Sequence, residues 1–288
     1  MLKIALPNKG RLADDARELF RDAGLEVRAH SERALTASLG GEFQALFVRA
    51  QDIPEFIADG AADVGVTGRD LIEESGRAIR EVADLGFGRC RLAVAARDDS
   101  GFAGIGDLPA GARVATTFPR ITTRFFAERG CRAEIVPISG AAEIAPHIGI
   151  ADVIVDLVST GSTLRVNGLR EMETVLDSTA RLVVADDPAR LDDAQRAAVD
   201  ELAAALLSVL RARSQRYLMA NVPRDRMSQV REIVPGLNGP TVIDILNGGT
   251  MVAVHAVVPA DGVFRTIARL KALGAEGILI TRIERLMA

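Results

Sequence analysis

The sequence predicts an α/β protein of two lobes, followed by a smaller ferredoxin-like module. Short β-branched segments alternate with helical patterns up to about residue 180, and this alternation is typical of sheets with helices on both faces. A long helix-forming stretch follows at 190–213. After it, the order of the patterns changes to βαββαβ, which is the ferredoxin-like order.

Six segments in the α/β part are short, β-branched and bounded by turn residues, so they are predicted to be strands. They are LKIALP (2–7), DVGVTG (63–68), RLAVAAR (91–97), RVATTF (113–118), AEIVPI (133–138) and DVIVDL (152–157). They form one set before about residue 90 and a second set from there to about 180, so we expect two lobes with a cleft between them. Ligands of such sheets gather at the carboxyl ends of the strands.

Helical patterns lie between many of these strands and predict mostly parallel sheets. The helices are expected at 11–23, 51–59, 69–75, 120–129 and 140–148. One segment breaks the rhythm: TASLGGEFQALFV (36–48) predicts a hairpin that turns at Gly40-Gly41, because adjacent glycines are common in tight turns.

The C-terminal part begins with RLDDAQRAAVDELAAALLSVLRAR (190–213), which combines good helix formers with apolar residues at helical spacing and predicts one long helix. The ferredoxin-like elements follow in order. They are strand 216–222, helix 224–234 entered through Pro223, strand 241–246, a turn at NGGT (247–250), strand 251–258, helix 262–273 and strand 277–283.

Composition favours small-molecule ligands. The 288 residues are 48% hydrophobic and can bury a substantial core, while the formal charge is −4 and no basic block with interleaved aromatics occurs, so nucleic acid and anionic membranes are not expected partners. No apolar run approaches the roughly 20 residues of a membrane span, and the N-terminus MLKIALPNKG does not resemble an export signal. We therefore expect a cytoplasmic protein.

Cysteine and histidine usage does not predict a metal centre. Cys90 and Cys131 are the only cysteines and are expected to be free thiols in a reducing compartment. His30, His147 and His255 are scattered without metal-ligand spacing, so no transition-metal site is expected.

The stretch ADVIVDLVSTGSTL (151–164) places two carboxylates in an apolar strand. Side chains at alternate positions of a strand share a face, so Asp152, Ile154 and Asp156 point one way. A buried, unpaired carboxylate costs several kcal/mol, so Asp156 needs a backbone donor, a cation or the hydroxyls of a ligand. A ribose diol fits that need.

The STGST segment that follows offers backbone N–H groups, hydroxyl side chains and the start of a short helix at 162–167. Such groups can bind a phosphate dianion. Together with Asp156 they predict a site for ribose 5-phosphate. A buried strand with a Ser/Thr-rich helix cap is the other interpretation of this stretch taken alone.

The wider segment EIAPHIGIADVIVDLVSTGSTL (143–164) resembles the signature of the ATP phosphoribosyltransferase family. The matching positions are Glu143, Gly149, Ala151, Ile154, Asp156, Thr160, Gly161, Thr163 and Leu164. Similar segments occur in the same order, at LPNKGRL (6–12), VTGRDLIEESG (66–76), LGFGRCRLAVA (85–95) and RVATTFPRITTRFF (113–126). The resemblance covers essentially the whole chain, and its length resembles the long form of the family, which carries a C-terminal regulatory domain.

This resemblance implies an enzyme that opens histidine biosynthesis. The family joins N1 of ATP to C1 of the ribose of phosphoribosyl pyrophosphate and releases pyrophosphate in the presence of Mg²⁺. Its catalytic half has a two-lobed fold like that of the type II periplasmic binding proteins.

The displacement builds positive charge on the ribose and negative charge on the leaving pyrophosphate. Catalysis therefore requires cations at the leaving group and positioning of both substrates. Because adenine N1 is already nucleophilic, no strong general base is expected. Mg²⁺ is expected to arrive with the pyrophosphate rather than in a dedicated protein cage.

The resemblance also implies site residues. Ribose and its 5-phosphate are assigned to Asp156, Ser159, Thr160, Gly161, Ser162 and Thr163, with Asp152 assisting from the start of the strand. Lys9 and Arg11 of PNKGR, and Arg49, are expected to meet phosphates, although each could be an ordinary solvated residue. Asp70 and Phe118 are assigned to the nucleotide, although Asp70 could be an ordinary first-turn helix residue stabilised by the helix dipole. Phe118 stands where a tyrosine is expected and cannot donate a hydrogen bond.

In the C-terminal module, PGLNGPTVIDIL (235–246) resembles the segment through which long forms bind histidine as a feedback inhibitor. Asn221, Thr241 and Gly277 are placed to enclose that small zwitterion, or are ordinary turn and strand-end residues. Feedback requires that histidine binds differently to two states of the enzyme. A homo-oligomer that exists as a dimer and as a hexamer is expected to supply those states.

The expected domains are a first catalytic lobe at 1–90 and 178–210, a second lobe at 91–177 that carries the ribose-phosphate motif, and a regulatory domain at 211–288.

Two alternatives to this function remain. A non-catalytic two-lobed sensor or solute-binding protein shares the architecture, but the export signal and the helix-turn-helix typical of such proteins are missing from the sequence. Another phosphoribosyltransferase would share the phosphate motif but not the matches at 6–12, 66–76 and 235–246.

Overall fold

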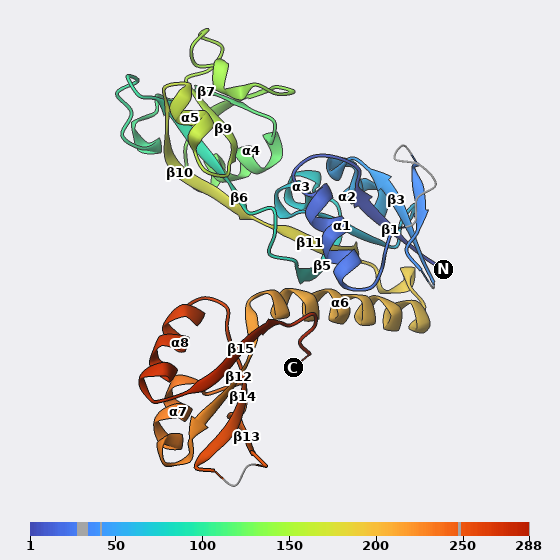
Figure 1. The fold of residues 1–288 in the computed structure, drawn as a ribbon. Coiled ribbons are helices and arrows are strands. Elements are labelled where there is room, and N and C mark those ends of the chain that lie inside the picture. Colours follow the sequence, from blue (N-terminus) through green and yellow to red (C-terminus); the bar gives the residue numbers. More distant parts are fainter. Residues whose placement is uncertain (28–33, 41, 247–248, 288) are drawn as a thin grey trace. The chain divides into compact units, whose positions relative to one another are not determined.

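The computed structural model describes residues 1–27, 34–40, 42–246 and 249–287. Gly41 of the expected hairpin turn, residues 247–248 of the NGGT turn and His30 lie outside the described residues. The chain divides into two compact units, one of residues 1–21 and 25–203, the other of residues 22–24 and 204–288. Figure 1 shows the elements of both units in sequence colours.

The first lobe of the larger unit contains a six-stranded sheet in the order β2-β3-β1-β4-β11-β5. Its strands are β1 (Leu2–Pro7), β2 (Thr36–Ser38), β3 (Phe43–Val48), β4 (Val64–Gly68), β5 (Ile79–Asp84) and β11 (Ala180–Ala185). Strand β1 is parallel to β3 and to β4. The antiparallel pairing of β2 with β3 confirms the expected hairpin.

The second lobe contains a five-stranded sheet in the order β10-β6-β9-β7-β8. Its strands are β6 (Cys90–Arg97), β7 (Ala112–Thr116), β8 (Ala133–Pro137), β9 (Val153–Val158) and β10 (Leu169–Ser178). Strand β7 is parallel to β8 and β9, while β6 runs antiparallel to both β9 and β10. The two sheets are therefore mixed, and the expectation of mostly parallel sheets was wrong.

The helices follow the sequence pattern closely, with one exception. The α-helices of the larger unit are α1 (Ala13–Asp22), α2 (Ile53–Ala58), α3 (Arg69–Ser75), α4 (Pro119–Glu128), α5 (Ser162–Val166) and α6 (Asp193–Arg213), the last of which continues into the smaller unit. Short 3-10 turns occur at Ala50–Asp52, Ile105–Asp107, Ala142–Ile144 and Pro188–Arg190. The helix expected at 140–148 is wrong, because only the turn at Ala142–Ile144 forms there. Pro146 lacks an N–H group and prevents a continuous helix across this segment.

Two crossing segments join the lobes. Strand β5 leads to β6 through residues 85–89, and β10 leads to β11 through Thr179. The segments are hydrogen-bonded to each other, since Leu85 N–H donates to Ala180 O at 2.9 Å and Ala180 N–H donates to Phe87 O at 3.0 Å. Figure 1 shows β6 and β10 side by side as they leave the second lobe. Two paired crossings of this kind are the hinge of a two-lobed α/β protein.

The sheet of the second lobe is buried on both faces. One face packs Leu92, Val94 and Val155 against aromatic residues of α4. The other face presents alanines of β6 and β7 to α5 and the turn at Ala142–Ile144. Small side chains on this second face allow the chain around the 151–164 motif to lie close to the sheet.

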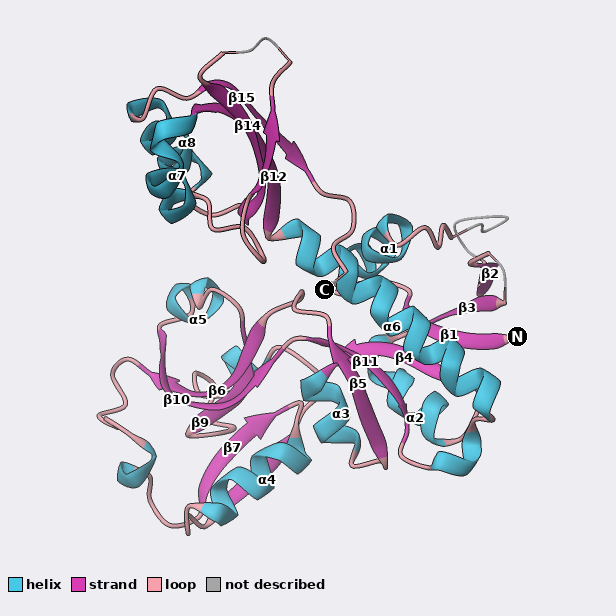
Figure 2. Cartoon of the chain, turned by 90° about the horizontal axis from the view of Figure 1, so that it is seen from below, coloured by secondary structure: helices cyan, strands magenta, loops and turns pink. Residues whose placement is uncertain are grey.

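The smaller unit has the expected βαββαβ order. Its elements are β12 (Gln215–Pro223), a 3-10 turn at Arg224–Arg226, α7 (Met227–Ile233), β13 (Thr241–Asp244), β14 (Met251–Pro259), α8 (Val263–Ala272) and β15 (Glu276–Arg282). The sheet is antiparallel throughout, in the order β13-β14-β12-β15. Figure 2 shows α7 and α8 together on one face of this sheet, where they bury a core of Leu218, Val230, Val254 and Leu270.

Among the described residues, no helix has the combination of length and apolar character needed to cross a membrane.

Candidate active site

A loop of exposed hydroxyl residues follows strand β9. The strand ends at Val158, Ser159 and Thr160 are exposed, and Gly161 begins α5 with φ +74°. A side chain at position 161 would be strained by this left-handed conformation. Thr160 Oγ1 and Ser162 Oγ are hydrogen-bonded at 3.0 Å. The chain therefore turns sharply here and leaves hydroxyl groups at the surface, while Ser162 N–H, the first of α5, donates to Thr160 Oγ1 at 3.4 Å. We call residues 159–163 the phosphate loop.

Asp156 lies two residues before the end of β9, on the face expected from the alternation. Its neighbour Ile154 packs with α5 and the turn at Ala142–Ile144, while Val153 and Val155 pack on the opposite face. The carboxylate is partly buried and accepts a hydrogen bond from Leu157 N–H at 2.8 Å. Burial raises the pKa of Asp156 above its ordinary value, and the negative charge of Glu143 raises it further, against the effect of the Leu157 hydrogen bond.

Asp152 lies at the other end of the same strand. It is exposed, and its carboxylate accepts a hydrogen bond from Arg113 N–H at 2.8 Å. Four residues of extended chain separate it from Asp156, a distance of about 13 Å. The structure thus places Asp152 away from the phosphate loop, where it joins β9 to β7.

The three basic residues expected to meet phosphates lie at one edge of the first sheet. Lys9 and Arg11 follow β1, and Arg49 follows β3. The two strands are parallel neighbours with Pro7 opposite Val48, and Asn8 N–H donates to Val48 O at 2.8 Å. All three basic side chains are exposed. Their charges therefore gather at the carboxyl edge of the sheet, where ligands of α/β proteins bind.

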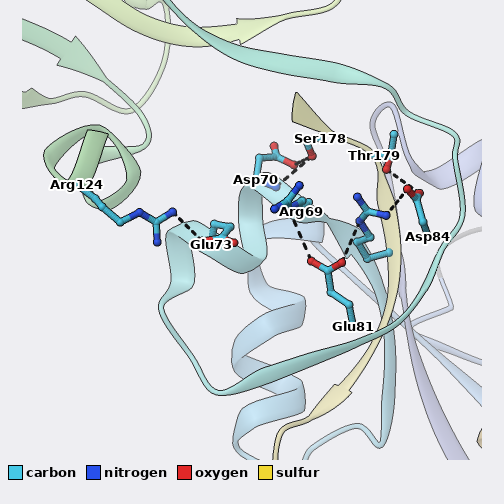
Figure 3. Close-up of polar contacts among 9 residues, drawn as sticks. Arg69, Asp70, Glu73, Glu81, Asp84, Arg124, Ser178 and Thr179 are labelled. Atoms are coloured by element: carbon cyan, nitrogen blue, oxygen red, sulfur yellow. Dashed lines mark hydrogen bonds and ion pairs between the residues drawn. The ribbon is translucent and has the colours of Figure 1, made fainter. Parts of the chain in front are cut away.

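Asp70 is buried rather than presented to solvent. It lies in the first turn of α3, is 1% exposed and accepts a hydrogen bond from Ser178 Oγ at 2.6 Å. Ser178 Oγ also accepts from Asp70 N–H at 3.1 Å. Figure 3 shows this pair beside Thr179 of the crossing segment and Asp84, the last residue of β5. Asp70 thus fixes the start of α3 to the hinge.

Cys90 belongs to the same buried group at the hinge. Burial raises the pKa of its thiol, and the charge of Asp70 acts in the same direction, whereas the side chains of Arg11 and Ser178 lower it. Arg11 is therefore near the hinge as well as at the sheet edge. Both cysteines are free thiols, as the sequence predicts.

Phe118 packs in the core of the second lobe. It is 5% exposed, and its N–H donates to Thr116 Oγ1 at 2.9 Å. Thr116 Oγ1 in turn donates to Val155 O at 2.7 Å. The ring shapes the start of α4 from inside and presents no free face for stacking on a base.

The three residues assigned to histidine lie on the sheet of the smaller unit. Asn221 is opposite Ala253, and Thr241 is opposite His255 on the far side of β14, so both point to the face that α7 and α8 leave open. Gly277 has φ +56° at an irregularity of β15, and a Cβ there would lie 3.4 Å from Asn221 Nδ2. Asn221 and Gly277 are therefore neighbours.

Among the described residues near the phosphate loop, the carboxylates of Asp156 and Glu143 are candidate metal ligands. Within the described ranges, no group of three or more His, Cys, Asp or Glu side chains could hold a metal ion. Asp156 and Glu143 interact electrostatically, and oxygen ligands suit Mg²⁺. This donor set fits an ion that arrives with most of its ligands on the substrate.

Three residues near the site had no role in the sequence analysis. Glu143 is one of the motif matches and lies within the turn at Ala142–Ile144, so its place in the motif was the available signal. Ser178 and Arg91 gave no signal, because their partners Asp70 and Glu171 are 108 and 80 residues away along the chain.

Fold and site together define a class: a two-lobed α/β protein of the type II periplasmic-binding-protein architecture, with a phosphate loop in one lobe, basic residues at the sheet edge of the other, and a ferredoxin-like C-terminal domain. The comparisons with known proteins are specific within that class. Residues 49–208 match the ATP phosphoribosyltransferase (HisG) family, and residues 212–285 match the HisG C-terminal domain.

Two relatives illustrate the match. The ATP phosphoribosyltransferase of Gemmatimonas aurantiaca is 66% identical over 291 residues, with all of both chains covered. That of Natronomonas pharaonis is 48% identical over 287 residues, covering 99% of this chain and 100% of the relative. Among solved structures, a chain of the Thermotoga maritima ATP phosphoribosyl transferase (HisG:HisZ) complex is 28% identical with a TM-score of 0.63, covering 73% of this chain and 99% of that one.

The chain belongs to the ATP phosphoribosyltransferase family, in the long form that carries the C-terminal regulatory domain. It is an enzyme of phosphoribosyl transfer in histidine biosynthesis, which sets the sensor alternative aside.

Proposed function

We propose that the enzyme transfers the phosphoribosyl group of phosphoribosyl pyrophosphate to N1 of ATP at the carboxyl edges of its two sheets. The observation that carries this proposal is the combination on β9: a partly buried carboxylate, Asp156, followed three residues later by the exposed phosphate loop. A ribose 5-phosphate offers a diol for the carboxylate and a dianion for the loop.

Binding and leaving-group stabilisation are divided between the lobes in this proposal. Asp156 accepts hydrogen bonds from the ribose hydroxyls, while Ser159, Thr160, Gly161, Ser162 and Thr163 hold the 5-phosphate. Lys9, Arg11 and Arg49 stabilise the negative charge that develops on the pyrophosphate as the C1–oxygen bond breaks. The adenine N1 lone pair forms the new bond to C1, so the protein orients two substrates and needs no general base.

Mg²⁺, when bound, would supply positive charge that offsets the charge of the leaving pyrophosphate. Asp156 and Glu143 are the carboxylates near the phosphate loop that would hold it from the protein side. The nucleotide is placed over α3 and α4, where Asp70 and Phe118 fix the first turns of the helices from behind. Asp152 acts in this proposal as a strand-end anchor of β9.

Regulation belongs to the smaller unit. Histidine binds on the open face of its sheet at Asn221, Thr241 and Gly277, and it inhibits by favouring a more compact oligomer, a hexamer, over the active dimer. We assign the functional domains to residues 1–90 with 178–210, to 91–177 and to 211–288. We place the enzyme in the cytoplasm, with no nucleic-acid or membrane partner.

Mass spectrometry tests the reaction directly. The purified full-length protein is incubated with ATP, phosphoribosyl pyrophosphate, Mg²⁺ and a pyrophosphatase that draws the reaction forward, with and without histidine. We expect a phosphoribosyl-ATP adduct that histidine suppresses. No adduct under any condition would contradict the assigned activity, and an adduct that histidine does not affect would contradict the assigned regulation alone.

A further inference from the structure

Arg91 has a well-defined environment in the second lobe that the reaction described above does not use. It is the second residue of β6 and lies opposite Val158, the last residue of β9. Its guanidinium group forms a two-pronged ion pair with Glu171 of β10, with Nε to Oε1 at 2.6 Å and Nη2 to Oε2 at 2.5 Å. This fork-to-fork geometry fixes the plane of the guanidinium group.

Glu171 is itself held in place. Thr174 Oγ1 donates to its Oε1 at 3.3 Å, and the register of β10 against β6 is irregular just after Glu171. The hydrogen bonds from Arg91 hold the pKa of the Glu171 carboxyl below its ordinary value, against the effect of burial. The pair therefore stays charged on both sides at neutral pH.

The third nitrogen of Arg91 faces the phosphate loop. Nη1 donates to Ser159 O at 3.4 Å, and the neighbouring carbonyl of Thr160 faces Arg165 Nη1 at 3.5 Å. In a trans peptide the C=O and the N–H point in opposite directions. When the Ser159 carbonyl is directed to Arg91, the Thr160 N–H is therefore directed to the other side of the loop. Likewise, the Thr160 carbonyl is directed to Arg165, so the Gly161 N–H is directed away from Arg165.

We propose that Arg91, oriented by Glu171, is a positioning residue for phosphoribosyl pyrophosphate: it holds the Ser159 carbonyl so that the N–H groups of the loop face the 5-phosphate. Arg91 acts through the loop rather than by touching the reacting atoms. This inference rests on the proposed function, because it requires that residues 159–163 bind the 5-phosphate.

A second pair on the same strand provides a matched control. Glu173, two residues beyond Glu171 on β10, pairs with Arg129 of the second lobe at 2.7 Å. The side chains of this pair are 35% and 36% exposed, close to the 33% and 27% of Arg91 and Glu171. Arg129 packs over the Phe125 ring, on the other face of the sheet from the loop. A role limited to fold stability would be shared by both pairs.

The test measures kcat and the KM of each substrate for Arg91→Met, Arg91→Lys, Glu171→Gln, the Arg91→Met/Glu171→Gln double variant, and Glu173→Gln. We expect Arg91→Met to raise the KM for phosphoribosyl pyrophosphate about tenfold, with the KM for ATP changed less than about twofold. Lysine should not restore the lower KM, because one ammonium group cannot pair with a carboxylate in a fork and reach a carbonyl as well.

The double variant separates positioning from simple additivity. If Glu171 acts by holding Arg91, the double variant should be no worse than Arg91→Met alone, and Glu173→Gln should match the unmodified enzyme. Thermal melting identifies any variant that fails to fold. Arg91→Lys and Glu171→Gln keep a long polar side chain at each position and so preserve the test.

Asp156→Ala distinguishes the possible failures. Suppose that the KM for phosphoribosyl pyrophosphate is unchanged in Arg91→Met and Arg91→Lys, while Asp156→Ala loses activity. This result would overturn the role of Arg91 and leave the proposed site intact. An unchanged KM for phosphoribosyl pyrophosphate in all of these variants, Asp156→Ala included, would overturn the assignment of the phosphate loop itself. A change in the KM for ATP equal to that for phosphoribosyl pyrophosphate would also overturn the positioning role.

Discussion

At the scale of single residues, Asp156 shows how a binding group can cost stability. Its carboxylate is partly buried, and Leu157 N–H is its hydrogen-bond donor among the described residues. Burial and the charge of Glu143 raise its pKa, so the folded protein favours the protonated form more than the unfolded chain does. A site prepared for ribose hydroxyls therefore carries, in the free enzyme, a carboxylate that forms no ion pair within the described part of the chain.

Asp156→Asn should stabilise the free enzyme and weaken substrate binding. As pH rises, Asp156 loses its proton at a lower pH in the unfolded chain than in the folded protein. Between these two pKa values the free energy of unfolding falls, and it stays lower at neutral pH. Asparagine cannot ionise, so the variant should gain about 1 kcal/mol at neutral pH. Below both pKa values the difference should vanish. Calorimetric melting across this pH range measures the effect.

Asp152→Asn is the control on the same strand. It changes the same chemical group at an exposed position that already accepts the Arg113 N–H, so neither stability at neutral pH nor the KM for phosphoribosyl pyrophosphate should change appreciably. If Asp156→Asn melted at a lower temperature than the unmodified protein at neutral pH, the account of an unpaired charge would be incorrect.

Sequence reasoning predicted residues whose role depends on neighbours in the chain. The alternation of β9 placed Asp156 and Ile154 on one face, and the structure confirms this. The burial of Asp70 could not be predicted, because its partner Ser178 is contributed by a strand that ends 108 residues later. Phe118 illustrates the same limit: an aromatic side chain before a helix can stack on a ligand or pack in the core, and tertiary contacts decide between them.

At the scale of elements, helices α3 and α4 make polar contacts that link the two lobes beside the hinge. Glu74 of α3 accepts hydrogen bonds from the N–H groups of Arg120 and Ile121 at 2.9 and 3.0 Å, so its carboxylate caps the first turn of α4. Glu73 pairs with Arg124 at 2.8 Å, as Figure 3 shows. Leu71 of α3 also packs against the core of the second lobe.

Glu74→Ala should lower the free energy of unfolding by about 1 kcal/mol, because two N–H groups of α4 lose a charged acceptor. Glu73→Ala breaks a more exposed ion pair with Arg124 and should cost less than about 0.5 kcal/mol. Urea unfolding followed by circular dichroism compares the two variants. An equal loss in both would mean that the carboxylate of Glu74 contributes no more than an ordinary surface charge.

Elements with strong local patterns were predicted well, whereas those defined by pairing were not. The long helix α6 and the βαββαβ order required only periodicity and turn residues. Strands β10 and β11, which read LREMETVLDS and ARLVVA, were not predicted, and β5 was also missed. These strands flank the hinge, and the charged residues of β5 and β10 hide the strand pattern until a partner strand is known.

At the scale of the whole molecule, the smaller unit has a complete core of its own, built from three strands and both of its helices. It also contains Tyr217, the single tyrosine of a chain without tryptophan. The Tyr217 hydroxyl is hydrogen-bonded to His255 Nδ1 at 2.7 Å, and both side chains lie on the open face of the sheet with Asn221 and Thr241. Tyrosine fluorescence therefore reports on the proposed histidine site alone.

Deletion of residues 211–288 should abolish inhibition by histidine, because the truncated chain retains both catalytic sheets and loses every residue of the proposed histidine site. Activity is measured by the phosphoribosyl-ATP adduct, with and without histidine. Loss of activity in the truncated chain would not decide the matter if the C-terminal unit also holds the oligomer together, so a second variant is needed.

Asn221→Ala in the full-length protein keeps the unit folded and should weaken inhibition about tenfold, with a matching loss of the histidine-dependent change in Tyr217 fluorescence. Because coupling between two sites is reciprocal, saturating substrate should in turn weaken histidine binding to the unmodified enzyme. Full inhibition of the truncated chain would show that histidine acts within the catalytic unit, and that the C-terminal unit has a different role.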